Sequence, residues 1–97
     1  MAGASPPPVL TLLTRPGCHL CDEARGELEL VLAERAAAGS RVPDVVEVDI
    51  ESQPTLLARH VESIPVLVFD GRELPLAIRP GAIRRFLKAA LDEGRAS

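Results

Sequence analysis

The sequence predicts a single α/β domain that combines helices with a mixed four-stranded sheet, in the order β-α-β-α-β-β-α. Three observations support this fold class. Short runs rich in apolar and β-branched residues alternate with longer helical patterns, as in a βαβ unit. The dipeptide Asp70-Gly71 separates two short strand-like runs and is a strong hairpin signal. The 97 residues, 46% of them hydrophobic, are enough for one modest core without support from a metal or a disulfide.

The first half of the chain is predicted to form a strand, a long helix and a second strand. Residues 9–14 (VLTLLT) are apolar and β-branched, as in a buried strand, and Arg15-Pro16-Gly17 ends them. A helix should follow from Cys18 or His19 to Ala38, and residues 45–50 should form the next strand. Because βαβ units cross over right-handed, we expect these two strands to pair in parallel. One face of the helix should carry the apolar residues Leu20, Ala24, Leu28, Val31 and Leu32.

The second half is predicted to form a short helix, a hairpin and a last helix. The short helix should cover residues 54–60, with Ser52 as its expected N-cap. Strand 66–69 should lead through Asp70-Gly71 into an antiparallel strand over residues 72–76, and Pro75 places that strand at a sheet edge. The last helix should cover residues 80–91, with an apolar stripe of Ile83, Phe86, Leu87 and Ala90. A disordered leader (1–8) and a tail (93–97) should flank the domain (9–92).

Composition argues against several classes of partner. The net charge is −3, no basic cluster is present, and only Phe69 and Phe86 are aromatic, so we expect no nucleic-acid partner. No run approaches the roughly 18 apolar residues of a membrane span. The N-terminal MAGASPPP lacks the charge and apolar run of a signal peptide. We therefore expect a monomer in the reducing cytoplasm, without a membrane partner.

The chemistry of the chain is concentrated in its only two cysteines, Cys18 and Cys21. In a reducing compartment such a close pair is more often catalytic or metal-binding than a permanent staple. Cys18 lies at a predicted helix start, where unpaired N–H groups stabilise a thiolate, and Arg15 adds positive charge. Asp22 and Glu23 oppose ionisation unless they point into solvent. Cys21, about one turn further on, is better suited to resolve a mixed disulfide than to attack.

Two motifs resemble the glutaredoxin-like branch of the thioredoxin superfamily: RPGCHLC (residues 15–21) after the first strand, and SIP (residues 63–65) before the third. The resemblance covers roughly residues 8–92. It implies a three-layer thioredoxin-like fold and a thiol–disulfide oxidoreductase active in electron transport. In this family the first cysteine attacks and the second resolves, which assigns these roles to Cys18 and Cys21. The family's cis-proline beside the cysteines corresponds to Pro65.

The resemblance also implies a substrate-binding surface. Ile64, just before the proline, would offer its backbone N–H and C=O to an extended substrate or to glutathione, and Arg15 corresponds to a basic residue that contacts a glutathione carboxylate. The chain departs from the family at His19-Leu20, where glutaredoxins have Pro-Tyr, and at residues 78–82, which lack the family's Gly-Gly motif and the acidic cap of its last helix. Expected partners are protein or small disulfides, with glutathione or a thioredoxin-type reductase as donor and no tightly bound cofactor.

Two other functional classes stay open from the sequence. A zinc site would need ligands beyond the cysteines, and only His19, His60 and carboxylates are available; we expect His60 to end its helix exposed and assign no metal ligand. An iron–sulfur cluster bridging two subunits belongs to the same class. The third class is a thioredoxin-fold module that binds proteins with an idle dithiol. Asp49 is expected at a solvated strand end, outside the site.

Overall fold

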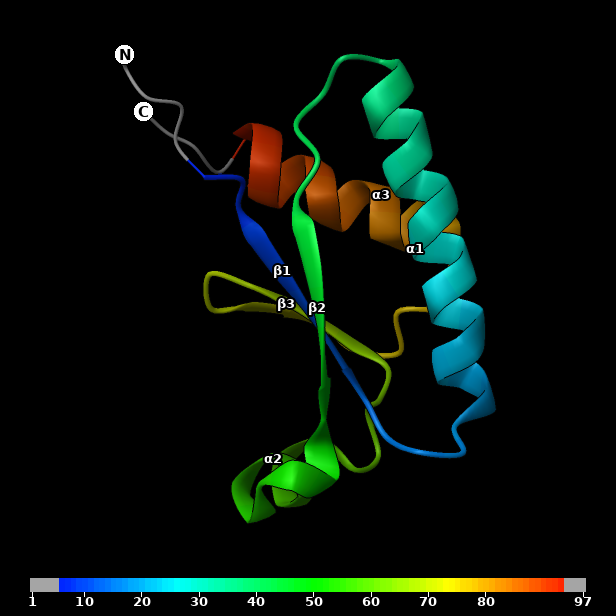
Figure 1. Cartoon of the computed structure of the whole chain (residues 1–97), viewed down its shortest axis with the longest axis vertical. Coiled ribbons are helices and arrows are strands. Elements are labelled where there is room, and N and C mark those ends of the chain that lie inside the picture. The colour runs from blue at the N-terminus through cyan, green and yellow to red at the C-terminus, as the bar shows by residue number, and fades with distance from the viewer. Residues whose placement is uncertain (1–5, 94–97) are drawn as a thin grey trace.

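The computed structural model describes residues 6–93, and it confirms the predicted fold class and element order (Figure 1). The sheet lies at the centre, α1 and α3 lie beside it, and α2 lies near one end of the strands. None of the helices within this range is both long and apolar enough to cross a membrane. The elements are β1 (Val9–Thr14), α1 (His19–Ala37), β2 (Asp44–Asp49), the 3₁₀ turn η1 (Ile50–Ser52), α2 (Pro54–His60), β3 (Val66–Phe69), β4 (Arg72–Leu74), α3 (Pro80–Leu87) and η2 (Lys88–Glu93), a π-helical extension of α3.

The four strands form one mixed sheet in the order β2-β1-β3-β4. β1 and β2 pair in parallel, with Leu12 opposite Glu47, as the βαβ pattern predicts. β3 runs antiparallel to β1 and to β4. Asp70 (φ 52°) and Gly71 (φ 83°) both occupy the left-handed region, which is the backbone of a type I′ hairpin turn. β4 is last in the strand order and is therefore an edge strand, as Pro75 next to it predicted.

Apolar side chains pack on both faces of the sheet, which gives the fold its three layers. On one face Leu10, Leu12 and Leu67 pack against α1 and α3. On the other face Leu13 and Val66 belong to a smaller cluster that includes side chains of α2. The larger cluster contains Leu10, Leu12, Leu28, Val31, Leu67, Ala77, Ile83, Leu87 and Leu91, and the smaller contains Leu13, Cys21, Ile50, Ile64 and Val66.

Two predictions about element ends were wrong in the second half of the chain. β4 ends at Leu74, two residues earlier than expected, because Pro75 follows and Leu76 adopts a positive φ of 50°. The N–H of Leu76 donates instead to the carbonyl of Ser63 at 2.9 Å. The last helix has the expected stripe, but its α-helical part ends at Leu87 and residues 88–93 continue it in a wider π-helical form.

Two side chains also differ from their predicted places. Leu20 was expected on the buried face of α1 but is 40% exposed, whereas Cys21 is buried. The buried residues of α1 are Cys21, Ala24, Leu28 and Val31, so the buried stripe starts one residue later than the apolar pattern indicated. Ser52 is not the N-cap of α2: Gln53 occupies that position without a side-chain bond, and the Ser52 hydroxyl donates to the carbonyl of Asp49 at 2.6 Å.

Candidate functional site

The chain places Cys18 at the N-terminal end of α1 by a tight turn. Gly17 has a φ of 73°, in the left-handed region that favours glycine, and this turn joins the end of β1 to the helix. Cys18 is the N-cap, with extended backbone angles (φ −94°, ψ 108°). Its carbonyl accepts the first helical hydrogen bond, from the N–H of Asp22 at 3.2 Å. The predicted position of the first cysteine is thus confirmed.

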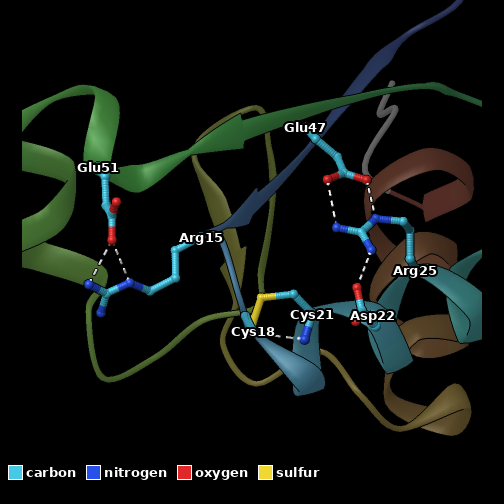
Figure 2. Close-up of a disulfide and its surroundings, with 7 residues drawn as sticks. All are labelled: Arg15, Cys18, Cys21, Asp22, Arg25, Glu47 and Glu51. Carbon is cyan, nitrogen blue, oxygen red and sulfur yellow. Dashed lines mark hydrogen bonds and ion pairs between the residues drawn. A yellow bond between two sulfur atoms is a disulfide. The ribbon is translucent and has the colours of Figure 1, made fainter.

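Cys18 and Cys21 form a disulfide, and their environments differ (Figure 2). Cys18 is half-buried, whereas Cys21 is 1% exposed and packs in the smaller hydrophobic cluster with Leu13 and Ile50. The Sγ of Cys18 accepts a hydrogen bond from the backbone N–H of Cys21 at 3.0 Å. An N–H aimed at this sulfur stabilises negative charge there when the disulfide is opened. The accessible sulfur is therefore also the one that the helix end stabilises.

The loop before β3 contributes Ile64 and Pro65 to the same region. Ile64 packs in the cluster that contains Cys21, with Cys18 at its border, and the Ile64–Pro65 peptide is cis. The N–H of Ile64, which we expected to be offered to a substrate, donates to the carbonyl of His60 at 3.2 Å. The Pro65 carbonyl accepts from Ala77 at 2.8 Å. The backbone N–H that we expected to bind a substrate is thus already bonded to the carbonyl of the last residue of α2.

Arg15 forms an ion pair that the sequence did not predict. Its Nε and Nη2 atoms lie 3.0 and 2.8 Å from Oε2 of Glu51, a residue of η1. Figure 2 shows the Arg15 side chain extending from the end of β1 towards Glu51 and away from the disulfide. Glu51 is 36 residues from Arg15. Only the parallel pairing of β1 and β2 brings the ends of these two strands together, so no local sequence pattern signals the contact.

A second arginine neutralises the carboxylate that directly follows Cys21. Arg25 of α1 donates to Asp22 at 2.6 Å and, through Nη2, to Glu47 of β2 at 3.0 Å. Hydrogen bonds with Glu47 and then Asp22 raise the pKa of Arg25 above its usual value. Figure 2 shows this guanidinium between the two carboxylates. The three-residue spacing of Asp22 and Arg25 is a helix-pair signal that could have been recognised from the sequence.

The two histidines do not join the cysteines. His19 is exposed, whereas His60 is only 5% exposed, contrary to prediction. Residues after α2 fold back at its end, where the N–H groups of Ser63 and Ile64 donate to the His60 carbonyl. Within residues 6–93, no three side chains of the His, Cys, Asp and Glu types are arranged to hold a metal ion.

One pocket of the described residues lies away from the cysteines. It has a volume of about 220 Å³ and lies between α1 and α3, where Glu34, Arg35, Arg84 and Lys88 contribute to its wall. Neither cysteine lines it. We consider the disulfide the better candidate site, because exchange between sulfur atoms requires an accessible sulfur rather than an enclosed cavity.

Comparisons with known proteins agree with the geometry. The X-ray structure of XcR50 from X. campestris is 32% identical, with a TM-score of 0.69 over 84% of this chain and 97% of that chain. The solution structure of XcR50 gives a TM-score of 0.66 at 32% identity, covering 84% and 94% of the two chains. No curated protein matches the sequence significantly. Residues 9–95 match the Glutaredoxin-like domain (DUF836) family, and the chain therefore belongs to this glutaredoxin-like family of the thioredoxin-like fold.

Proposed function

We propose that this protein is a thiol–disulfide oxidoreductase in which Cys18 attacks and Cys21 resolves. The observation that carries the proposal is the asymmetry of the pair. Cys18 is half-buried at the N-terminal end of α1, and its sulfur accepts a hydrogen bond from a backbone N–H. Cys21, one turn further on, is buried. Membership of the glutaredoxin-like family supports a redox role for such a pair.

The reaction starts from the reduced dithiol. The Cys18 thiolate attacks one sulfur of a substrate disulfide, the substrate S–S bond breaks, and one substrate thiol leaves after taking up a proton. The Cys21 thiolate then attacks Sγ of Cys18, forms the protein disulfide and releases the second thiol. The substrate gains two electrons and the protein loses two. Glutathione or a thioredoxin-type reductase restores the dithiol, and no metal or bound cofactor is required.

The surface next to the cysteines favours polypeptide substrates. Leu20, between the two cysteines, is 40% exposed, and Leu76 is 51% exposed. The backbone of Leu76 is bonded to Ser63, which directly precedes Ile64 and Pro65. A polypeptide substrate can cover these exposed apolar side chains and bury apolar surface, whereas a small thiol is too small to do so. In this proposal the Ile64 carbonyl accepts a hydrogen bond from the bound chain, as in β-augmentation.

Trapping of the mixed disulfide tests the assigned roles. We expect reduced Cys21→Ser protein to accumulate a mixed disulfide at Cys18 after addition of hydroxyethyl disulfide, because the resolving thiol is missing. Reduced Cys18→Ser protein should accumulate almost none, since the remaining sulfur is buried. Intact-protein mass spectrometry and peptide mapping measure both adducts. Accumulation mainly on Cys21 would reverse the roles, and no adduct on either variant would contradict thiol–disulfide exchange.

A further inference from the structure

The ion pair between Arg15 and Glu51 lies at the same end of the sheet as the cysteines. Arg15 is three residues before Cys18, and Glu51 follows β2, the parallel neighbour of β1. Both side chains are partly accessible, with exposed fractions of 36% and 42%. The guanidinium of Arg15 thus already donates through Nε and Nη2 to a carboxylate of the same chain.

This pair changes what Arg15 offers to a substrate. A free guanidinium binds a carboxylate through two parallel hydrogen bonds and attracts negative charge. Glu51 uses one such edge and neutralises the charge, at distances of 2.8 and 3.0 Å. A carboxylate-bearing thiol must therefore either displace Glu51 or bind Arg15 more weakly. The binding of a disulfide without a nearby carboxylate is unaffected by Glu51.

We propose that Glu51 is a specificity-determining residue that competes with substrate carboxylates for Arg15. It directs the dithiol towards disulfides that carry no carboxylate near the reacting sulfur, such as those within polypeptides, and away from glutathione disulfide. The exposed Leu20, between the two cysteines, agrees with this substrate class. The inference deepens the proposed function and rests on it. The exchange steps, atoms and electrons are those given above; only the relative rates for the two substrate classes change.

The test compares reduction of glutathione disulfide with reduction of hydroxyethyl disulfide, which has no carboxylate. The quantity is the ratio of kcat/KM for the first substrate to kcat/KM for the second, with a dithiol as reductant. In Glu51→Gln we expect this ratio to rise about two- to fivefold, the range of an exposed ion pair. The rise should shrink at high salt, because it depends on a partly exposed charge. It should also disappear in the Arg15→Gln/Glu51→Gln double variant.

Glu34→Gln is the matched control. Glu34 pairs with Arg84 through two hydrogen bonds of 2.8 and 2.9 Å, so the same substitution removes an equivalent ion pair from the wall of the pocket between α1 and α3. We expect the substrate ratio of this control to match the wild type. An unchanged ratio in Glu51→Gln, or an equal rise in Glu34→Gln, would overturn the inference.

A binding measurement separates this inference from the proposed function. S-methylglutathione keeps the carboxylates of glutathione but has no exchangeable thiol, so its binding does not require redox turnover. We expect Glu51→Gln to bind it two- to fivefold more tightly than the wild type does in an NMR titration. Tighter binding without turnover of either disulfide would contradict the proposed function alone. Turnover of both disulfides, with no change in binding or in ratio, would contradict the role of Glu51 alone.

Discussion

At the scale of single residues, the two sulfur atoms differ in access and in electrostatic surroundings. Cys18 is half-buried and its Sγ accepts the N–H of Cys21, whereas Cys21 is 1% exposed among apolar side chains. Thiolate, the reactive form, is favoured by hydrogen-bond donors at a helix start and disfavoured by an apolar environment. In the proposed function, the same helix turn makes the Cys18 thiol reactive and keeps the Cys21 thiol protected.

The first prediction concerns the alkylation rates of the reduced protein. Near neutral pH, iodoacetamide should modify Cys18 quickly and Cys21 at least about tenfold more slowly, because only Cys18 is both accessible and stabilised as a thiolate. Timed quenching followed by peptide mass spectrometry measures both rates. In denaturant the two rates should become similar, which serves as the control. Equal rates in the folded protein would show that the helix start does not activate Cys18.

The sequence predicted these residues unevenly. Cys18 and Cys21 could be placed because their position depends on a local pattern, a strand followed by Pro-Gly and a helix start. The partner of Arg15 could not be predicted, because Glu51 is 36 residues away in the sequence and only the pairing of β1 with β2 brings it close. The Ile64 N–H was expected to be free and is not, for a different reason: the chain folds back locally after α2, so that this N–H donates to the His60 carbonyl four residues earlier.

At the scale of elements, both ends of α1 are tied to neighbouring elements by arginines. Near the cysteines, Arg25 joins the helix to Glu47 of β2. At the other end, Arg35 joins it to Asp92 of η2 at 2.7 Å and donates to the carbonyl of Arg41 at 2.7 Å. The Arg35 side chain is only 10% exposed, so its pair with Asp92 is less screened than a fully exposed one.

The second prediction concerns the pH dependence of this contact. The hydrogen bond from Arg35 lowers the pKa of Asp92 below its usual value. A carboxylate with a lowered folded-state pKa stabilises the protein above its unfolded pKa of about 3.9, and this contribution is lost as the pH falls through the folded value. Asp92→Asn should therefore lower the free energy of unfolding at pH 7 by about 0.5–1 kcal/mol, a range reduced for the partial exposure of Asp92.

Urea denaturation of both proteins at pH 7 and below pH 4 measures this effect. The difference between wild type and Asp92→Asn should be largest at pH 7 and should shrink at the lower pH. Glu29→Gln, on the exposed face of α1, is the control and should change stability by less than about 0.5 kcal/mol. A difference that is constant with pH would show that the Asp92 charge does not stabilise the fold.

The order and type of the elements could be predicted, but some of their ends could not. Local patterns indicated each strand and helix, and the Asp-Gly pair indicated the hairpin turn. The early end of β4 goes with a hydrogen bond from the N–H of Leu76 to the carbonyl of Ser63. These two residues are distant in the sequence, so no local pattern indicates the contact. The π-helical extension of α3 carries Ala90 and Leu91 into buried positions, and nothing in the apolar stripe distinguishes this form from an α-helix.

At the scale of the whole molecule, the sheet separates a larger hydrophobic cluster from a smaller one. α1 and α3 cover the larger cluster, and the cysteines lie at the smaller one with α2 (Figure 1). Cys21, Ile64 and Val66 share this smaller cluster, so the first turn of α1 and the loop before β3 meet at the cysteine pair. The disulfide thus lies outside the larger cluster.

A redox titration of the Cys18–Cys21 pair tests the central claim most directly. The protein is equilibrated in glutathione and in dithiol buffers of known potential, and the free thiols are counted by alkylation and mass spectrometry. If the pair is an exchangeable dithiol, both buffers should give a single two-electron transition between about −120 and −300 mV, the range of exchangeable disulfides. A pair that stays oxidised below about −300 mV, as structural disulfides do, would contradict the account.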